Sequence, residues 1–261
     1  MAIKRLGRVP VWQQIAQELR TSIFDGSYPP GAQLPTEVEL TERYEVARNT
    51  VRQALSALVN EGLVVSARPR GYFVRDRRPI HYRPQEEFRR KPRSPEMDAF
   101  LTEHSATGRV PRQTIEVAIV DPPNDVRKRL QLAKGEPAVV RRRVRYLDGE
   151  PFNTNDSYYP LRLVQETEIM RPDDIARGAN QVLSEAGYPQ VRALDEFYIR
   201  MPTPDEARRL DVGPGTPVAY HVCTGYVEDG TPVRVVLNVL PGDRHVITYE
   251  RSRPETDEDG S

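Results

Sequence analysis

Residues 35–74 read PTEVELTERYEVARNTVRQALSALVNEGLVVSARPRGYFV, and their pattern decides the fold of the N-terminal part of the chain. Thr36 and Glu39 form a T-x-x-E capping box, which predicts the start of a short helix. A second helix is predicted from an apolar stripe with helical spacing, namely Val51, Ala54, Leu55, Leu58 and Val59. The apolar runs 63–65 and 72–74 then predict a β-hairpin. This order of elements is typical of a winged helix-turn-helix.

The polar face of the second predicted helix carries side chains that can bind base edges. Opposite the apolar stripe lie Arg48, Asn49, Arg52, Gln53 and Ser56. In helix-turn-helix proteins the N-terminal half of such a helix lies in the major groove. There arginine can bind guanine and asparagine can bind adenine, each through two hydrogen bonds. An isolated amphipathic helix is more often simply solvated, but the flanking elements favour DNA contact.

The turn of the predicted hairpin, residues 66–71, is basic and ends in glycine. Gly71 permits a backbone with positive φ, and Arg68 and Arg70 lie at the tip. Two arginines in this position suit a wing that contacts phosphates or enters the minor groove. An ordinary solvated hairpin tip is the alternative, and the preceding helices favour the wing.

One more helix is predicted upstream, because apolar residues recur there at every fourth position: Val11, Ile15, Leu19 and Ile23. Turn residues around Asp25-Gly26 and Pro29-Pro30-Gly31 separate it from the capping box. We therefore expect residues 1–75 to form a small winged helix-turn-helix DNA-binding domain.

Three stretches of this domain resemble the GntR family of bacterial transcription regulators. They are YPPGAQLPTE at 28–37, RNTVRQAL at 48–55 and residues 58–63, and the resemblance spans 11–75. It implies that Arg48, Asn49, Thr50 and Arg52 contact DNA from the recognition helix and that Gly71 forms the tip of the wing.

The chain departs from the usual family pattern at three positions. Val38 stands where many members have arginine, so we expect one DNA contact to be missing. Glu45 occupies a turn position where glycine is common, which predicts a strained turn. Ala47 replaces the usual serine or threonine cap, at an expected cost of about 1 kcal/mol. These departures bear on the operator sequence and leave DNA binding itself in place.

The charge of the chain is unevenly distributed, although its 38 basic and 38 acidic residues cancel over 261 positions. Residues 1–93 hold 17 basic and 10 acidic residues, a net charge of +7, and the remainder holds 21 and 28, a net charge of −7. A basic N-terminal part followed by an acidic one suits a DNA-binding domain joined to a second domain with another task.

The remaining composition argues against several other classes of protein. Cys223 is the single cysteine, which rules out an internal disulfide, and we expect it to be a buried small side chain. The four histidines show no metal-ligand spacing, so no metal site and no cofactor are expected. The sequence contains no run of 18 apolar residues and no signal peptide. A cytoplasmic protein without membrane contact is therefore expected.

Proline and arginine dominate residues 76–95, which lack helical or strand periodicity and are expected to be an interdomain linker. Whether its arginines contact DNA stays open at this point. Residues 251–261 are expected to form a disordered acidic tail. This leaves 96–250 as the second domain.

A weak internal repeat organises the second domain. Residues 124–152 and 205–235 each read as a helix, a G-x-P turn, a strand, a D-G turn and a second strand. A further helix is expected between the copies, capped by Asp173 or Asp174 and ending near Ala186. The pattern predicts an α+β domain on a mostly antiparallel sheet.

This layout resembles the UTRA effector-binding domain of the HutC subfamily. The supporting residues are Arg143-Val144-Arg145, Asp148 to Pro151, Asp156 to Pro160 and Gly242-Asp243-Arg244. The resemblance implies a chorismate-lyase-like sheet over about residues 95–250 that binds a small molecule and forms a homodimer.

Candidate effector contacts follow from residues that share a strand face. Arg143 and Arg145 are two apart on one strand, and Arg234 and Asn238 are four apart on another. Ser157 and Tyr158 could add hydroxyl groups. Charged groups on one face suit an anionic ligand such as a phosphate or carboxylate. The alternative is a solvated charged strand face.

Together these features predict a transcriptional repressor, whose homodimer binds a palindromic double-stranded operator and responds to a small effector. An activator remains open. An enzyme is the second hypothesis, because the implied fold is shared with a lyase. No nucleophile–base pair supports it, and Asp195 and Glu196 point to opposite faces of a strand. An effector-independent DNA-binding protein is the third hypothesis.

Overall fold

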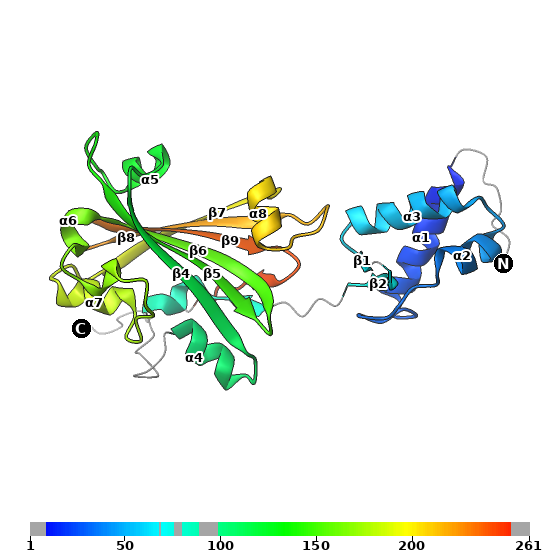
Figure 1. Cartoon of the computed structure of the whole chain (residues 1–261), viewed down its shortest axis with the longest axis horizontal. Coiled ribbons are helices and arrows are strands. Elements are labelled where there is room, and N and C mark those ends of the chain that lie inside the picture. Colours follow the sequence, from blue (N-terminus) through cyan, green and yellow to red (C-terminus); the bar gives the residue numbers. More distant parts are fainter. Residues whose placement is uncertain (1–8, 68, 76–79, 89–98, 252–261) are drawn as a thin grey trace, which may run out of the picture.

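The computed structural model describes residues 9–67, 69–75, 80–88 and 99–251, which form two domains along the chain (Figure 1). The N-terminal domain is the expected winged helix-turn-helix. Its elements are α1 (Val11–Phe24), α2 (Glu37–Tyr44), α3 (Arg48–Asn60), β1 (Val64–Ala67) and β2 (Gly71–Val74). The two strands pair antiparallel and form the wing.

The core of this domain is built from the predicted apolar stripes. Side chains of three helices and the wing are fully buried together, among them Ile15, Leu19, Leu40, Val51, Leu55, Leu58 and Val64. Each such side chain contributes about 1.5–3 kcal/mol when it leaves water. The capping box is present as expected, because the Thr36 hydroxyl accepts from the Glu39 backbone N–H and the Glu39 carboxylate accepts from Thr36.

The departures from the family pattern have visible effects on the backbone. Glu45 adopts left-handed angles, φ 53° and ψ 46°, where a residue with a Cβ pays about 1–2 kcal/mol. Ala47 precedes α3 and provides no side-chain cap, so the first backbone donors of the recognition helix stay open to DNA or water. Val38 is exposed on α2.

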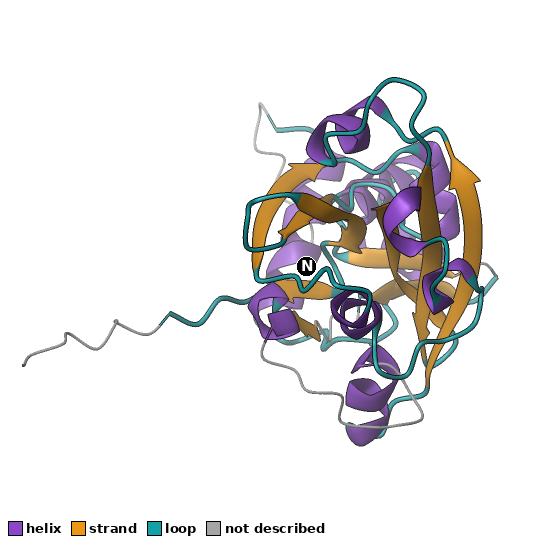
Figure 2. Cartoon of the chain, turned by 90° about the vertical axis from the view of Figure 1, so that its left-hand side faces the viewer, coloured by secondary structure: helices purple, strands orange, loops and turns teal. Residues whose placement is uncertain are grey.

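The C-terminal domain is built on an antiparallel sheet, which in the described residues has six strands in the order β4-β5-β6-β9-β8-β7. Their bounds are β4 (Pro111–Val120), β5 (Ala138–Leu147), β6 (Glu150–Pro160), β7 (Arg192–Arg200), β8 (Val218–Tyr226) and β9 (Pro232–Pro241). This confirms the expected α+β class. Figure 2 shows how strongly the strands curve.

The internal repeat is present as two half-sheets that meet at β6 and β9. The first half runs β4, α5 (Asn124–Arg129), β5 and β6, and the second runs β7, α8 (Pro204–Arg209), β8 and β9. Gln131 and Asp211, which follow the two helices at equivalent positions, both have positive φ. The D-G turn after β5 has positive φ at both residues, as the hairpin signal requires.

Helices cover both faces of the sheet (Figure 1). α5 and α8 pack on one face through Val126, Leu130 and Leu210. The other face is covered by α4 (Ala99–Ala106), α6 (Leu161–Val164), η2 (Glu168–Met170) and α7 (Ala179–Glu185), which pack on Val139, Tyr159 and Phe152. The second face holds the candidate effector site.

Part of the expected linker belongs to the C-terminal domain. Residues Ile80–Tyr82 form β3, which pairs in parallel with β10 (His245–Ile247), and Pro84–Phe88 form the 3-10 helix η1. Residues 76–79 and 89–98 lie outside the described residues, as do 252–261 of the expected tail. Residues 80–88 therefore form regular structure that their composition does not predict, because β3 is hydrogen-bonded to a strand far away in the sequence.

The two domains contact each other at the end of the wing. The Arg75 backbone N–H donates to the Leu63 carbonyl at 2.9 Å, while its guanidinium donates to Thr216 Oγ1 at 3.1 Å and forms an ion pair with Asp243. Both partners of the ion pair are about nine-tenths buried. Gly215 approaches the backbone of Asn60 so closely that a Cβ would lie 1.4 Å from its carbonyl oxygen.

Candidate DNA interface and effector cavity

Glu37 organises the arginines of the recognition helix. Its carboxylate accepts from Arg48 Nε at 2.7 Å and from Arg52 Nε at 3.0 Å. The two arginine side chains are 62% and 54% exposed, whereas Glu37 is 16% exposed. Because each arginine is held through Nε, its terminal nitrogens stay available for a partner in solution.

The Glu37 carboxylate stays ionised in this arrangement. Burial alone would raise the pKa of Glu37, but the hydrogen bonds from Arg48 and Arg52 lower it below its usual value. Glu37 therefore orients two cations at neutral pH. This role could not be predicted from local pattern, because the pairing joins the first turn of α2 to α3 across the turn between the helices.

Replacing Glu37 by Gln is expected to lower discrimination between operator and random DNA by about tenfold, within the 1–3 kcal/mol typical of one base-reading pair. The variant loses the carboxylate that orients Arg48 and Arg52. The net charge of the surface formed by these arginines and Glu37 also becomes more positive by one. Affinity for random DNA should rise and its salt dependence should steepen.

Fluorescence anisotropy on both DNAs at several salt concentrations measures these effects. Glu42→Gln, an exposed acid on the same helix, is the control for charge alone. Equal behaviour of the two variants would contradict an orienting role.

The other predicted DNA contacts are distributed over α3 and the wing. Asn49 and Gln53 are exposed, and Thr50 is partly buried. In the wing, the Arg70 guanidinium lies over the Phe73 ring at 5.4 Å, and Gly71 has φ 111° with the Gln33 amide close by. Arg68 lies outside the described residues.

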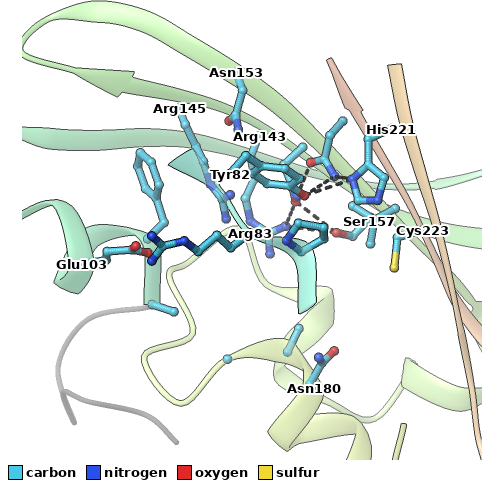
Figure 3. A pocket seen from close by; sticks show the side chains of 18 of the residues that line it. Tyr82, Arg83, Glu103, Arg143, Arg145, Asn153, Ser157, Asn180, His221 and Cys223 are labelled. Atoms are coloured by element: carbon cyan, nitrogen blue, oxygen red, sulfur yellow. Dashed lines mark hydrogen bonds between the residues drawn. The ribbon is translucent and has the colours of Figure 1, made fainter. Parts of the chain in front are cut away.

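A cavity of about 270 Å³ opens on the second face of the sheet (Figure 3). Its floor is formed by strands of both half-sheets, and β3, α4 and α7 form its walls. The predicted effector residues that line it are Arg143, Arg145, Ser157, Arg234 and Asn238. The fold thus brings together residues that lie up to 95 positions apart in the sequence.

Tyr158 does not line the cavity. It is buried against Val126 and Leu130 on the opposite face, because neighbouring residues of a strand alternate. Tyr159 lines the cavity instead. Arg141, on the same face as Arg143, is fully buried and donates to backbone carbonyls of residues 169, 171 and 173, which gives it a structural role.

Three arginines of the cavity contact neutral or aromatic side chains. Arg143 Nη1 donates to Asn155 Oδ1 at 2.9 Å and to Ser157 Oγ at 3.3 Å. The Arg145 guanidinium lies over the Phe100 ring at 4.6 Å. Arg234 donates to the Asn180 side chain.

A chain of side-chain hydrogen bonds crosses the floor from the first half-sheet to the second. Asn155 Nδ2 donates to Asn238 Oδ1 at 2.6 Å, and Asn238 Nδ2 lies 2.9 Å from His221 Nδ1. The Tyr82 hydroxyl, from β3, also lies 3.0 Å from this nitrogen (Figure 3). At the far end His221 Nε2 contacts Asp195 Oδ1 at 2.8 Å.

The contacts of His221 favour one tautomer of its neutral ring, and those of Asp195 favour its ionised form. Because an amide N–H of Asn238 points at Nδ1, the neutral imidazole of His221 carries its proton on Nε2 and donates it to Asp195. Burial would raise the pKa of Asp195, but hydrogen bonds from His221 and Cys223 lower it below its usual value. The carboxylate is thus held ionised beside the cavity.

Several cavity residues gave no signal in the sequence. Tyr82 lies in a segment that reads as a linker, His221 is a polar residue in a largely apolar strand, and Asn155 is one of several polar residues in a row on β6. The Asn153 side-chain oxygen and the Tyr159 hydroxyl are buried and have no hydrogen-bond partner within the part of the chain that the structure describes. Such atoms suit polar groups of a ligand or bound water.

Among the described helices, none combines the length and the apolar composition that a membrane crossing demands.

Comparison with known proteins assigns both domains. Residues 12–74 match the model for bacterial regulatory proteins of the gntR family, and residues 106–246 match the model for the UTRA domain. A GntR-family transcriptional regulator of known crystal structure covers 94% of this chain and 98% of its own length, with a TM-score of 0.63 and 24% identity.

Two curated relatives extend over the whole chain. An uncharacterised HTH-type transcriptional regulator of Streptomyces coelicolor is 32% identical over 95% of both chains. The HTH-type transcriptional repressor NagR of Bacillus subtilis is 29% identical and covers 97% of this chain and 99% of its own. With DNA-binding and effector-binding domains in this order, the chain belongs to the GntR family of bacterial transcriptional regulators, not to an enzyme family, and carries a UTRA domain.

Proposed function

We propose that this regulator is a homodimeric repressor that is released from a palindromic operator by a small anionic effector rich in hydroxyl groups. The gathering of Arg143, Arg145 and Arg234 on one cavity carries this proposal. Guanidinium groups bind phosphate and carboxylate through paired hydrogen bonds, and the neighbouring amides and hydroxyls suit a polyol. Phosphorylated or carboxylated sugars fit this description best.

Burial and size support this class of ligand. Arg143 and Arg234 are 9% and 8% exposed, so an anion would bind them away from bulk water, where charge-assisted hydrogen bonds are strong. Glu103 is the one carboxylate among the described lining residues. A cavity of about 270 Å³ lies just below the usual range of about 300–1,000 Å³ for ligand sites, which favours a small ligand.

A contiguous set of contacts supports a route from the cavity to the DNA-binding domain. Tyr82 is a cavity residue on β3, and β3 is hydrogen-bonded to β10. β10 begins two residues after Asp243, whose carboxylate pairs with Arg75 at the end of the wing. A ligand that moves Tyr82 therefore acts on the ion pair that ties the two domains together.

Replacing Asp243 by Asn is expected to leave effector affinity within about twofold while shrinking the effector's influence on operator binding, which typically amounts to 5–150-fold in such systems. The ion pair lies outside the cavity lining, so only transmission is removed. Calorimetry for the effector and anisotropy for the operator measure the two quantities separately.

Asp229→Asn, in an exposed turn, serves as the control for this substitution. Loss of effector binding itself in the Asp243 variant would contradict the route.

The outer edge of the sheet supports self-association. β7 ends the strand order, and large apolar side chains on and after it are exposed, namely Leu194, Tyr198, Ile199 and Met201. Such an edge is normally covered by a partner. Two copies would present two α3 helices to successive major grooves. Sedimentation across a concentration range tests this, and a monomer at all concentrations would exclude it.

The function as a whole is tested in two steps. Selection from random DNA with the purified protein is expected to yield a palindromic operator. Its affinity is then measured with sugar phosphates, sugar acids and the matching uncharged sugars. Release by one charged ligand and by none of its uncharged analogues supports the proposal. Unchanged affinity across the panel would favour an effector-independent DNA-binding protein.

A further inference from the structure

Three potential metal ligands lie together where the second half-sheet borders the cavity. Asp195 of β7 is directly opposite Cys223 of β8 in the strand register, and His221 lies two residues before Cys223 on the same face. Their ligand atoms all lie within 4.8 Å of one another. His221 and Cys223 are 2% and 4% exposed, and both line the cavity (Figure 3).

We propose that Asp195, His221 and Cys223 form a binding site for a divalent transition metal ion, with Zn²⁺ as the best match, and that its fourth position faces the effector cavity. Zn²⁺ accepts thiolate, imidazole and carboxylate ligands at about 2.0–2.3 Å. A tetrahedron of these bond lengths separates its ligand atoms by about 3.3–3.8 Å, which the cluster can adopt with small side-chain adjustments.

The hydrogen bonding of the cluster suits replacement of protons by a metal ion. His221 Nε2 already points at the Asp195 carboxylate, at 2.8 Å. On binding, the Cys223 thiol releases its proton to solvent, and the imidazole proton moves from Nε2 to Nδ1. Nδ1 would then donate to the Tyr82 hydroxyl, now at 3.0 Å, as metal-bound histidines usually donate through their second nitrogen. The Asn238 amide N–H, which points at Nδ1 without metal, would turn fully to the Tyr82 hydroxyl, its second acceptor at 3.3 Å.

The charge of the cluster also fits. A thiolate and a carboxylate together cancel the charge of one divalent cation, so a neutral site results in a half-buried position. In the first half-sheet the positions equivalent to His221 and Cys223, counted from the shared G-x-P turn, are Arg141 and Arg143. At these two equivalent positions the first half-sheet therefore carries arginines, and the second carries metal-ligating groups.

Aromatic packing holds the imidazole in place for metal binding. The Phe197 ring stacks on His221 with centroids 4.3 Å apart and an interplanar angle of 7°. The Tyr82 ring meets it edge-on at 5.5 Å. A metal–nitrogen bond lies in the plane of the imidazole, so stacking on its face orients the ring and leaves the bond direction clear.

Titration of the full-length protein with Co²⁺ in place of Zn²⁺ tests the site without DNA or effector, so its outcome is independent of the proposed function. One Co²⁺ per chain with a thiolate-to-cobalt charge-transfer band is expected, and Zn²⁺ should displace it. Cys223→Ser should remove the band, and Asp195→Asn should lower affinity at least about tenfold. Wild-type protein that binds Co²⁺ without this band would overturn the proposal.

Matched controls separate the cluster from other histidines and acids. Glu196→Gln changes the neighbouring residue of β7, whose carboxylate instead pairs with Arg129. His81→Gln removes a histidine that contacts Thr248 rather than the cluster. Both variants should keep the band and the affinity. Loss in either control equal to that in Asp195→Asn would also overturn the assignment.

Chemical protection gives a second readout that needs no variant. Cys223 is the single cysteine of the chain, so a thiol reagent reports on this position alone. Bound Zn²⁺ is expected to slow alkylation at least about tenfold, because the reagent attacks the free thiolate. An alkylation rate that does not change at saturating Zn²⁺ counts against the site.

Discussion

Arg52→Ala is expected to weaken binding to the selected operator by about 5- to 150-fold, which corresponds to about 1–3 kcal/mol, while affinity for random DNA falls much less. Arg52 is exposed on the recognition helix and is held through Nε by Glu37, with its terminal nitrogens toward solvent. An arginine held in this way loses little conformational freedom when it binds a base edge, so its removal costs mainly specific contacts.

Competition anisotropy with operator and shuffled DNA at one salt concentration measures the difference. Arg48→Ala should give a loss of the same kind, because Glu37 holds it in the same way. Arg20→Ala is the control, since this arginine pairs with Glu61 on another part of the domain. Equal losses on both DNAs would reassign Arg52 to phosphate contact, and no loss would remove it from the interface.

The second large effect is expected at Arg143. Arg143→Gln should reduce affinity for the anionic effector by about 30-fold or more, within the 2–5 kcal/mol that losing one partner of a buried charge pair costs. The amide of glutamine can keep contacts with Asn155 and Ser157, so the floor of the cavity retains its polar partners. Operator binding without effector should stay unchanged.

Arg142→Gln is the matched control for this experiment. Arg142 is the next residue of β5, points to the other face and pairs with Glu116. Calorimetric titration of both variants with the effector measures the contrast. If the two variants lose affinity equally, the effector binds elsewhere or the loss reflects general charge.

The sequence predicted those features that depend on local pattern. The capping box at Thr36, the apolar stripe of α3 and the D-G turns each depend on a few neighbouring residues, and each is present. The repeat of helix and hairpin predicted the antiparallel sheet for the same reason. Strand alternation also brought Arg143, Arg145, Arg234 and Asn238 to one face.

Features that depend on distant partners could not be predicted in this way. The hydroxyl of Tyr158 suggests a ligand contact by residue type, but the register of β6 turns this side chain toward α5. The helix expected to be capped by Asp173 or Asp174 begins only at Ala179, because Gly178 with φ 83° interrupts the backbone and the preceding carbonyls bind Arg141. Likewise, the spacing of His221 and Cys223 alone does not indicate a metal site, because the third ligand, Asp195, lies on the neighbouring strand β7.

The position of Tyr82 has a consequence for how this protein can be recombined with its relatives. In chain order the cavity begins before the sheet that encloses it, because β3 comes first and is held by β10 at the other end of the domain. In a chimera joined after residue 88, β3 would come from one parent, whereas the sheet that forms the cavity floor would come from the other. In a chimera joined between Arg75 and Ile80, all cavity residues would come from the C-terminal parent. Ligand preference is then expected to be that of the C-terminal parent alone.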